Sequence, residues 1–252
     1  MKVRIFSGET HTEMIHRLAK DMKLDEAILN QIYQARAHYE EADIFSGTYL
    51  IAREADENTT MTHLFRQSHE KLEAFIRKYF THQPDDYTIK LLLTIASIIQ
   101  KESNDPKEMP LIASVIYNRL ERGMKLQMDG TLNYGTFSHQ IVTPERIRND
   151  TTFYNTYKYK GLPPAPLATV SLKALYAAMF PAETGYLFFM LNKDGTHSFS
   201  ATYKEHLSHL RAFRAYQKKR QQKRQKKEPG TKVSRKHEKP QTQKSLQSAK
   251  KP

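Results

Sequence analysis

The chain has 252 residues, which is enough for one large domain or two small domains with a hydrophobic core. Its formal net charge of +13 is concentrated in residues 217–252, where 14 Lys and Arg accompany 2 Asp and Glu, so the other 216 residues, with 26 basic and 25 acidic side chains, carry only +1. Because residues 1–216 are nearly neutral, they are not expected to form a nucleic-acid-binding domain, and only residues 217–252 could bind nucleic acid. The absence of cysteine excludes disulfides, a thiol nucleophile and a cysteine-ligated metal.

Residues 1–52 are predicted to form a small α+β module with the element order strand, helix, helix, strand. Residues 2–6 alternate as a short strand, and Thr10 with Glu13 has the pattern of a capping box before a helix. A second helix is expected to open near Asp25, and residues 47–51 have the composition of a second strand.

Residues 53–84 are predicted to be a connecting region whose main element is an amphipathic helix over residues 60–80. Asp85 or Asp86 is the expected N-cap of the next helix. From residue 88 to 101 that helix is apolar on nearly every side, which is typical of a helix inside a core.

Glu102 lies in the last turn of this apolar helix, because the Asn-Asp-Pro sequence at residues 104–106 ends it. Isoleucines lie one and two turns back on the same face. Apolar neighbours and the negative end of the helix dipole both disfavour a charged carboxylate, so the pKa of Glu102 should be raised, as a general acid requires. The alternative is an ordinary solvated glutamate that Lys101 neutralises.

The next helix is expected to begin near Pro106 and to end at Gly123, and a strand is expected over residues 124–129. Asn118 and Arg119 come just before the end of that helix, where an ordinary capping network would account for them. In the strand, Gln127 and Asp129 share a polar face opposite the apolar side chains.

The segment from residue 151 is rich in tyrosine, including Tyr154 and Tyr157 on either side of Asn155. Tyrosine rings combine an apolar face with a hydroxyl, which suits either the wall of a ligand groove or the edge of a core. Further scaffold is expected as a helix over 171–180, strands over 186–191 and 197–199, and a last helix over 201–216. Residues 217–252 have too few apolar side chains to bury and are predicted to be disordered.

Four blocks of the sequence carry a family resemblance. In chain order they are ASIIQKES, PLIASVIYNRLERGMKLQMDGTLNYG, YNTYKYKGLPPAPLATVSLKALYAAMFPAETGYLFFM and DGTHSFSATYKEH, within roughly residues 91–206. Together they resemble the endolytic murein transglycosylases of the YceG-like family. The chain departs from the family at Gln100, where many relatives have a second glutamate, and at Ala165, where glycine is more frequent.

The resemblance implies an α+β fold with a LysM-like module over residues 1–52 and a mainly helical catalytic domain with short strands over residues 85–216. It also implies a lytic transglycosylase that cleaves the MurNAc-β-1,4-GlcNAc bond inside nascent peptidoglycan strands and leaves 1,6-anhydro ends. The family's catalytic acid falls on Glu102. The substrate-binding residues that it implies are Ser103, Asn118, Arg119, Gln127, Asp129, Tyr154, Asn155 and Tyr157. His197 matches a family histidine and is equally well explained as a structural residue.

Asp129 leaves the mechanism open. Glycoside hydrolases normally use two carboxyl groups, and Asp129 is the available second one. A lytic transglycosylase can work with one acid, because the acetamido group of N-acetylmuramate stabilises the developing cation and the sugar's own 6-hydroxyl replaces water.

No metal or organic cofactor is implied, and His206 with His209 is only a weak metal signal. The expected partners are glycan strands and peptidoglycan synthases. The family is anchored in the inner membrane by one span with its catalytic part facing the periplasm, and since this chain begins almost directly at a strand, an anchor is expected upstream of Met1. The rival interpretations are a catalytically silent glycan- or division-protein-binding module, and a pyridoxal-phosphate lyase, for which no suitable lysine stands out.

Overall fold

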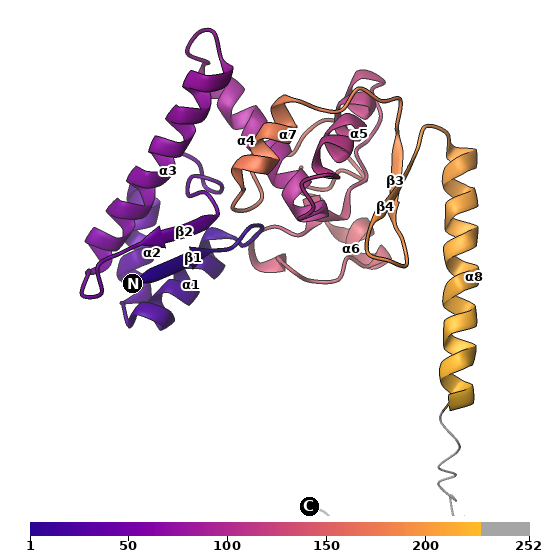
Figure 1. Cartoon of the computed structure of the whole chain (residues 1–252), viewed down its shortest axis with the longest axis horizontal. Helices are drawn as coiled ribbons and strands as arrows, with labels where there is room; N and C mark the ends of the chain where they lie inside the picture. The colour runs from indigo at the N-terminus through magenta and orange to yellow at the C-terminus, as the bar shows by residue number, and fades with distance from the viewer. Residues whose placement is uncertain (228–252) are drawn as a thin grey trace, which may run out of the picture. The chain divides into compact units, whose positions relative to one another are not determined.

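The computed structural model describes residues 1–227, with side chains to residue 219 (Figure 1). Residues 1–210 form one compact unit, and a second unit begins at Arg211. The elements are β1 (Lys2–Ile5), α1 (His11–Met22), α2 (Glu26–Arg36), β2 (Gly47–Leu50), α3 (Glu57–Tyr79), α4 (Asp86–Glu102), α5 (Met109–Glu121), η1 (Asp129–Leu132), η2 (Gly135–Phe137), α6 (Pro144–Asn149), α7 (Leu172–Met179), β3 (Phe188–Leu191), β4 (His197–Ser200) and α8 (Tyr203–Lys227).

The N-terminal part has the predicted order of strand, helix, helix, strand. β1 and β2 pair antiparallel, with Lys2 opposite Leu50 and Ile5 opposite Gly47. The capping box is present: the Thr10 side chain accepts from the amide of Glu13, whose carboxylate accepts from the amide of Thr10. The apolar sides of β1, β2, α1 and α2 enclose a first core, which the first half of α3 completes with Met61 and Leu64.

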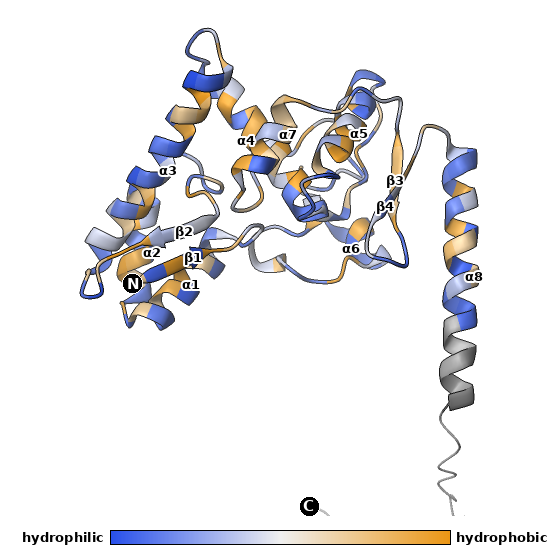
Figure 2. Cartoon of the chain, in the orientation of Figure 1, coloured by the Kyte–Doolittle hydropathy of each residue, from blue (hydrophilic) through white to orange (hydrophobic). Residues whose placement is uncertain are grey.

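A second core surrounds α4, and Figure 2 shows that much of this helix is hydrophobic. Asp85 caps its N-terminus by accepting from the amide of Thr88, so the first of the two predicted caps is the one used. Ile95, Ala96 and Ile98 of α4 are fully buried against α5 and α7. This burial on all sides agrees with the expectation for an apolar helix inside a core.

The two cores share parts of the chain. α3 contributes its first half to the first core and Phe75 and Ile76 to the second, and the loop after α2 contributes Tyr39 and Phe45 to the second core. Backbone bonds join the same regions, since Gly8 N donates to Thr169 O at 2.8 Å and Ser46 N donates to Val170 O at 2.9 Å.

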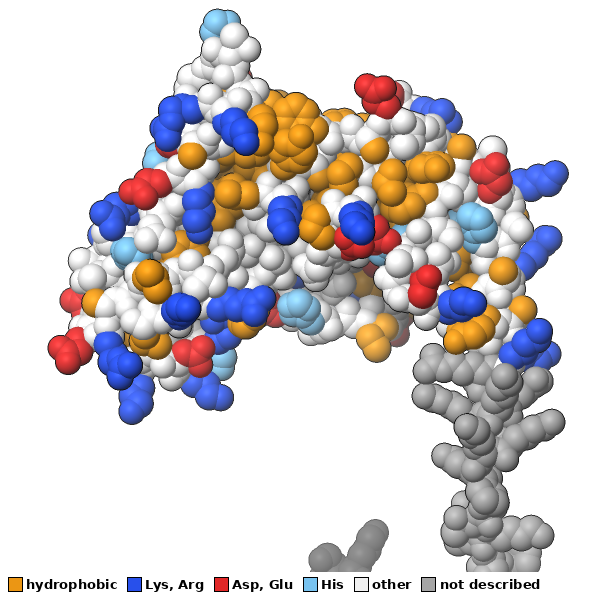
Figure 3. All heavy atoms as spheres, in the orientation of Figure 1, with side chains coloured by type: hydrophobic (Ala, Val, Ile, Leu, Met, Phe, Trp, Pro, Cys, Tyr) orange, Lys and Arg blue, Asp and Glu red, His pale blue; other side chains and the backbone are white. Residues whose placement is uncertain are grey.

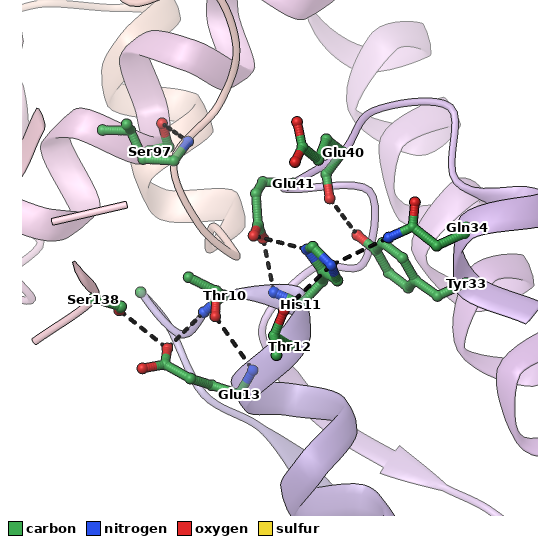
Figure 4. A network of polar contacts seen from close by, with 12 residues as sticks. Thr10, His11, Thr12, Glu13, Tyr33, Gln34, Glu40, Glu41, Ser97 and Ser138 are labelled. Atoms are coloured by element: carbon green, nitrogen blue, oxygen red, sulfur yellow. Dashed lines mark hydrogen bonds and ion pairs between the residues drawn. The ribbon is translucent and has the colours of Figure 1, made fainter. Parts of the chain in front are cut away.

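A polar network also joins the N-terminal part to the rest of the compact unit. Figure 4 shows the Glu13 carboxylate accepting from both the Thr10 amide and the Ser138 hydroxyl. Ser138 in turn accepts from Lys101 Nζ, which also donates to Gly8 O at 2.7 Å. Lys101 precedes Glu102, so this contact holds the end of α4 directly against the N-terminal part.

The predicted strand over residues 124–129 is wrong. Within the described part of the chain, no strand pairs with residues 124–129. Gln127 also has a φ of 51°, which an extended strand does not allow. Instead Gln127 N donates to Thr156 O, and Asp129 begins the short helix η1. The predicted alternation of burial is nevertheless present, because Leu126 and Met128 are buried while Gln127 and Asp129 are exposed.

The C-terminal prediction is wrong in its first part. α8 continues past residue 216 to Lys227, so residues 217–227, predicted to be disordered, are helical. The rest of the predicted tail, residues 228–252, lies outside the described residues. α6 was not predicted from the sequence at all.

Within the described part of the chain, no helix is long and apolar enough to cross a membrane. Apolar side chains do gather on one face over α7, as Figure 3 shows. Leu172, Tyr176 and Phe180 are exposed there, and Tyr79 of α3 packs edge-on against Tyr176 and Phe180.

Candidate active site

A pocket of about 380 Å³ opens where α4 ends. The segment from Leu126 to Asp129 and the β3–β4 hairpin form its other walls. Its lining residues are Glu102, Arg119, Leu126, Gln127, Met128, Asp129, Tyr157, Phe189, Met190, Leu191 and His197. Five of the nine site residues expected from the sequence are therefore brought together here: Glu102, Arg119, Gln127, Asp129 and Tyr157.

Glu102 is the last residue of α4, and its Oε1 accepts a hydrogen bond of 2.9 Å from the amide of Gly130. Burial raises the pKa of this carboxyl group to about 7. The Gly130 amide and His197 act in the opposite direction, and the negative charge of Asp129 adds to the rise. A group that is half protonated near neutral pH can both donate and accept a proton, which is what acid–base catalysis needs.

Gly130 is held so close to Glu102 that no side chain fits. A Cβ at this position would lie 2.8 Å from Glu102 Oε1 and 2.8 Å from Lys101 Cβ, well inside normal contact distance. Glycine is therefore required here by close approach. This approach brings the amide that binds the carboxyl group of Glu102 within hydrogen-bonding distance.

Asp129 and Tyr157 form the polar wall facing Glu102. The Tyr157 hydroxyl donates to Asp129 Oδ1 at 2.6 Å. Burial and the neighbouring carboxylate raise the pKa of Tyr157, so the phenol stays protonated and keeps donating to Asp129. Asp129 is thus a second carboxylate in the pocket, with one of its oxygens already engaged.

Arg119 shapes the pocket from behind. Its buried guanidinium donates to Leu187 O at 2.6 Å and to Lys125 O and Leu126 O at 3.0 and 2.7 Å. It also donates to Gln127 Oε1 at 3.3 Å. Arg119 therefore ties the segment before η1 to the start of β3, and does so with the planar, multidentate geometry that lysine lacks.

His197 is fixed by two bonds to Glu108. Its Nδ1 lies 2.7 Å from Glu108 Oε2, and its backbone amide donates to Oε1 at 2.6 Å. Ser103 donates to the same carboxylate at 2.9 Å. Sequence reasoning left His197 undecided and did not single out Glu108, because 89 residues separate the pair and no local pattern connects them.

The other four expected site residues do not line the pocket. Ser103 binds Glu108, and Asn118 donates to Thr184 O and Tyr186 O. Tyr154 stacks on Tyr134 with ring centroids 4.2 Å apart, and Asn155 is buried, donating to Ile147 O and Asp150 O. Asn155 also accepts from the amide of Tyr157, so it places a pocket residue without entering the pocket.

Among the described residues, no group of three or more His, Asp or Glu side chains is arranged to hold a metal ion. Of the two histidines in the weak metal-binding pattern, His206 packs against an aromatic ring: it stacks on Phe188 with ring centroids 5.3 Å apart.

A carboxyl group with a pKa near neutrality, beside a second carboxylate in a polar pocket, defines an acid–base site. The sequence matches the family model described as the YceG-like family over residues 1–212, so the chain belongs to the YceG-like family.

Curated relatives and a solved structure agree with this assignment. The endolytic murein transglycosylase of Bacillus subtilis is 29% identical over 194 residues, 76% of this chain and 52% of the relative. That of Streptococcus pneumoniae is 33% identical over 156 residues, 60% of this chain and 28% of the relative. The crystal structure of a YceG-like protein from Listeria monocytogenes matches with a TM-score of 0.67 at 28% identity, covering 82% of this chain and 75% of that one. The chain thus spans about half the length of the Bacillus relative, and less of the Streptococcus one.

Proposed function

We propose that this protein is an endolytic lytic transglycosylase that cleaves the β-1,4 bond between N-acetylmuramic acid and N-acetylglucosamine within peptidoglycan strands. The observation that carries the proposal is Glu102, whose carboxyl group has a pKa raised to about 7 and faces a polar pocket. The names of the curated relatives, endolytic murein transglycosylases, supply the substrate class.

Glu102 is the proposed catalytic acid. In its protonated form it donates to the glycosidic oxygen as that oxygen leaves, and the acetamido group of the muramic acid stabilises the positive charge that develops at the anomeric carbon. The 6-hydroxyl of the same sugar then attacks this carbon and closes a 1,6-anhydro ring. Glu102, now a carboxylate, is able to accept the proton that the hydroxyl releases.

The remaining site residues have two kinds of proposed role. Gln127, Asp129 and Tyr157 line the pocket and would bind sugar hydroxyl and acetamido groups. Arg119 also lines the pocket, and we assign it a supporting role because it binds backbone carbonyls of the pocket wall. The residues with the same supporting role outside the pocket are Ser103, Asn118, Tyr154 and Asn155. They hold the surrounding segments through hydrogen bonds to Glu108 and to backbone carbonyls and, for Tyr154, through ring stacking.

We also propose the finer organisation that the family resemblance implies. Residues 1–52 would act as a LysM-like module contacting glycan, residues 53–84 would connect, and residues 85–216 would form the catalytic domain. The strand–helix–helix–strand order supports the first of these assignments. A substrate of nascent strands places the protein outside the cytoplasm at the inner membrane, held by an anchor outside this sequence, with peptidoglycan synthases as neighbours.

Product analysis tests this function. Purified, uncrosslinked glycan strands incubated with the protein should give fragments from inside the strands with 1,6-anhydro ends by mass spectrometry. Glu102→Gln keeps size and hydrogen bonding but removes the transferable proton, and should lower the rate by about 10²–10⁴-fold. Reducing ends in place of anhydro ends would indicate hydrolysis and give Asp129 a catalytic role.

The same assay addresses the rival interpretation of a silent binding module. Such a module would bind glycan strands equally well with Glu102 or with Gln at this position, and neither form of the protein would cleave the strands. Retention of a tenth of the wild-type rate by Glu102→Gln would rule out Glu102 as the acid.

A further inference from the structure

A groove of about 570 Å³ lies between α3 and α7, and it shares no lining residue with the candidate active site. Phe75 and Tyr79 line it from α3, and Leu172 and Tyr176 line it from α7. Leu172 and Tyr176 are 37% and 43% exposed, and Phe180, directly after α7, is 40% exposed. Large apolar side chains that are exposed together, unlike single ones, indicate an interaction surface.

Three lysines also line this groove, and no acidic residue does. Lys71 and Lys78 lie two turns apart on α3, and Lys173 lies on α7. Figure 3 shows Lys or Arg side chains beside the apolar region over α7. Burial lowers the pKa of Lys71, and its Nζ lies 3.9 Å from the centroid of the Tyr49 ring. Within the described part of the chain, none of the three lysines forms an ion pair, so an anionic ligand would supply their counter-charge.

Charge and composition argue against three other occupants of the groove. Residues 228–252 contain seven basic and two acidic residues, a net charge of +5, so the three lysines would repel them. A second copy of the chain using the same groove would bring two sets of three lysines together. Interfaces with other proteins are enriched in arginine and depleted in lysine, whereas every cation lining this groove is lysine.

Lysine and tyrosine beside aliphatic and aromatic side chains are the combination that suits the surface of a lipid bilayer. Lysine stems lie along apolar surface while their ammonium groups reach the headgroups, and tyrosine rings lie at the boundary between headgroups and acyl chains. Binding to such a surface grows with the apolar area that is buried and with the attraction of basic residues to anionic lipid.

We propose that the groove between α3 and α7 docks the protein on a bilayer that contains anionic phospholipid. The three lysines bind headgroup phosphates, and Leu172, Tyr176 and Phe180 enter the boundary with the acyl chains. This docking goes beyond the proposed function, because it gives the described part of the chain its own contact with the membrane in addition to the proposed anchor. It does not depend on cleavage of glycan.

A fluorescent probe tests the insertion of Tyr176. The chain contains no tryptophan, so Tyr176→Trp in the full chain introduces a single fluorophore into the groove. Its emission should shift to shorter wavelength with vesicles of phosphatidylglycerol and phosphatidylcholine at about 3:7, and should stay unchanged with phosphatidylcholine alone. Tyr87→Trp is the matched control, because Tyr87 is 72% exposed outside the groove, and its emission should not shift.

A second measurement separates the groove from the overall basic charge of the chain. Lys78→Gln with Lys173→Gln should weaken binding to the anionic vesicles by about 10-fold. Lys2→Gln with Lys20→Gln removes the same charge at exposed positions outside the groove, leaves residues 217–252 intact, and should weaken binding by less than about twofold. An equal loss in the two variants would assign binding to the overall charge and would overturn the proposal.

The apolar contribution has its own pair of variants. Leu172→Gln should weaken binding to the anionic vesicles by about fivefold, and Leu50→Gln, at a position of β2 that is 66% exposed, should leave binding unchanged. Unchanged emission of Tyr176→Trp with anionic vesicles overturns the proposal and makes an acidic protein segment the occupant to seek. The lysine variants should cleave glycan strands at the wild-type rate without vesicles, so failure of lipid binding and failure of the proposed function are distinguishable.

Discussion

The Glu102 carboxyl group is more stable protonated in the folded protein than in the unfolded chain. Burial is the main cause, and it raises the pKa from 4.5 to about 7. The folded state therefore holds this proton more tightly than the unfolded state between those pH values. The stability that this contributes is fully present below about pH 4.5 and is lost as the pH rises through about 7.

Glu102→Gln should accordingly be more stable than the wild type at alkaline pH. At pH 8 the wild type must bury a carboxylate, and the neutral amide avoids this cost, so we expect the variant to gain about 1–3 kcal/mol in free energy of unfolding. At pH 4 the gain should disappear. Urea denaturation at the two pH values measures the difference, and an equal effect of the substitution at both would contradict the raised pKa.

Gly130 is the second residue whose substitution has a definite expected result. In Gly130→Ala the new Cβ would collide with Glu102 Oε1 and Lys101 Cβ, so η1 must move away and the amide bond to Glu102 must lengthen. We expect a loss of about 1–3 kcal/mol in stability and a fall in kcat of at least tenfold. Gly185→Ala is the control, because its Cβ would meet nothing within 4 Å. Normal activity in Gly130→Ala would show that the close approach is dispensable.

At the scale of elements, the site depends on how α4, α5 and the β3–β4 hairpin are joined. α4 supplies Glu102 at its end, and α5 supplies Arg119, which holds both the segment before η1 and the start of β3. The hairpin brings His197 back over the beginning of α5, where Glu108 accepts from it. These hydrogen bonds join residues of different elements, so the site depends on how the elements pack together.

Arg119→Met should therefore loosen two elements at once. Methionine fills similar volume but leaves the carbonyls of Leu187 and Leu126 without their donors, at a cost of about 2–4 kcal/mol in unfolding free energy. Hydrogen exchange should rise in residues 124–129 and at the start of β3. Arg122→Met, at an exposed position after the same helix, is the control and should cost under about 0.5 kcal/mol. Exchange that rises equally across the whole chain would contradict this local role.

At the scale of the whole molecule, some residues of the predicted small module and connecting helix also belong to the second core, around α4. Tyr39 and Phe45 from the loop after α2, and Phe75 and Ile76 from α3, pack against the helices around α4. Lys101 adds a polar link from the end of α4 to Gly8. The predicted domain boundary at residue 85 therefore does not separate two hydrophobic cores, because residues on both sides of it contribute to the core around α4.

A fragment of residues 85–216 should fail to fold cooperatively on its own. Losing four large buried side chains that fill its core removes several kcal/mol, at about 1.5–3 kcal/mol each, from a total stability of roughly 5–15 kcal/mol. We expect a broad thermal transition and binding of a hydrophobic dye, while residues 1–216 should melt in one sharp transition. A sharp transition of the fragment within a few degrees of the longer chain would show that the catalytic domain is independent.

The sequence by itself determined the local elements around the site. The Thr10–Glu13 capping box, a cap at Asp85 or Asp86 and the apolar periphery of α4 act over one or two turns of chain, so they are visible as spacing, although the structure was needed to select Asp85. The same apolar surroundings predicted the raised pKa of Glu102. The alternation of burial at residues 124–129 was also visible, although not the backbone that carries it.

Only the tertiary structure decided how the pocket is closed. Residues 124–129 do not form a strand because Arg119 and Thr156 satisfy their polar groups in place of a neighbouring strand. His197 meets Glu108 across 89 residues, and the Tyr157 hydroxyl meets Asp129 across 28. Such contacts have no local periodicity, because they arise when separate elements pack on a shared core, and this is why the sequence placed Glu102 but not the histidine beside it.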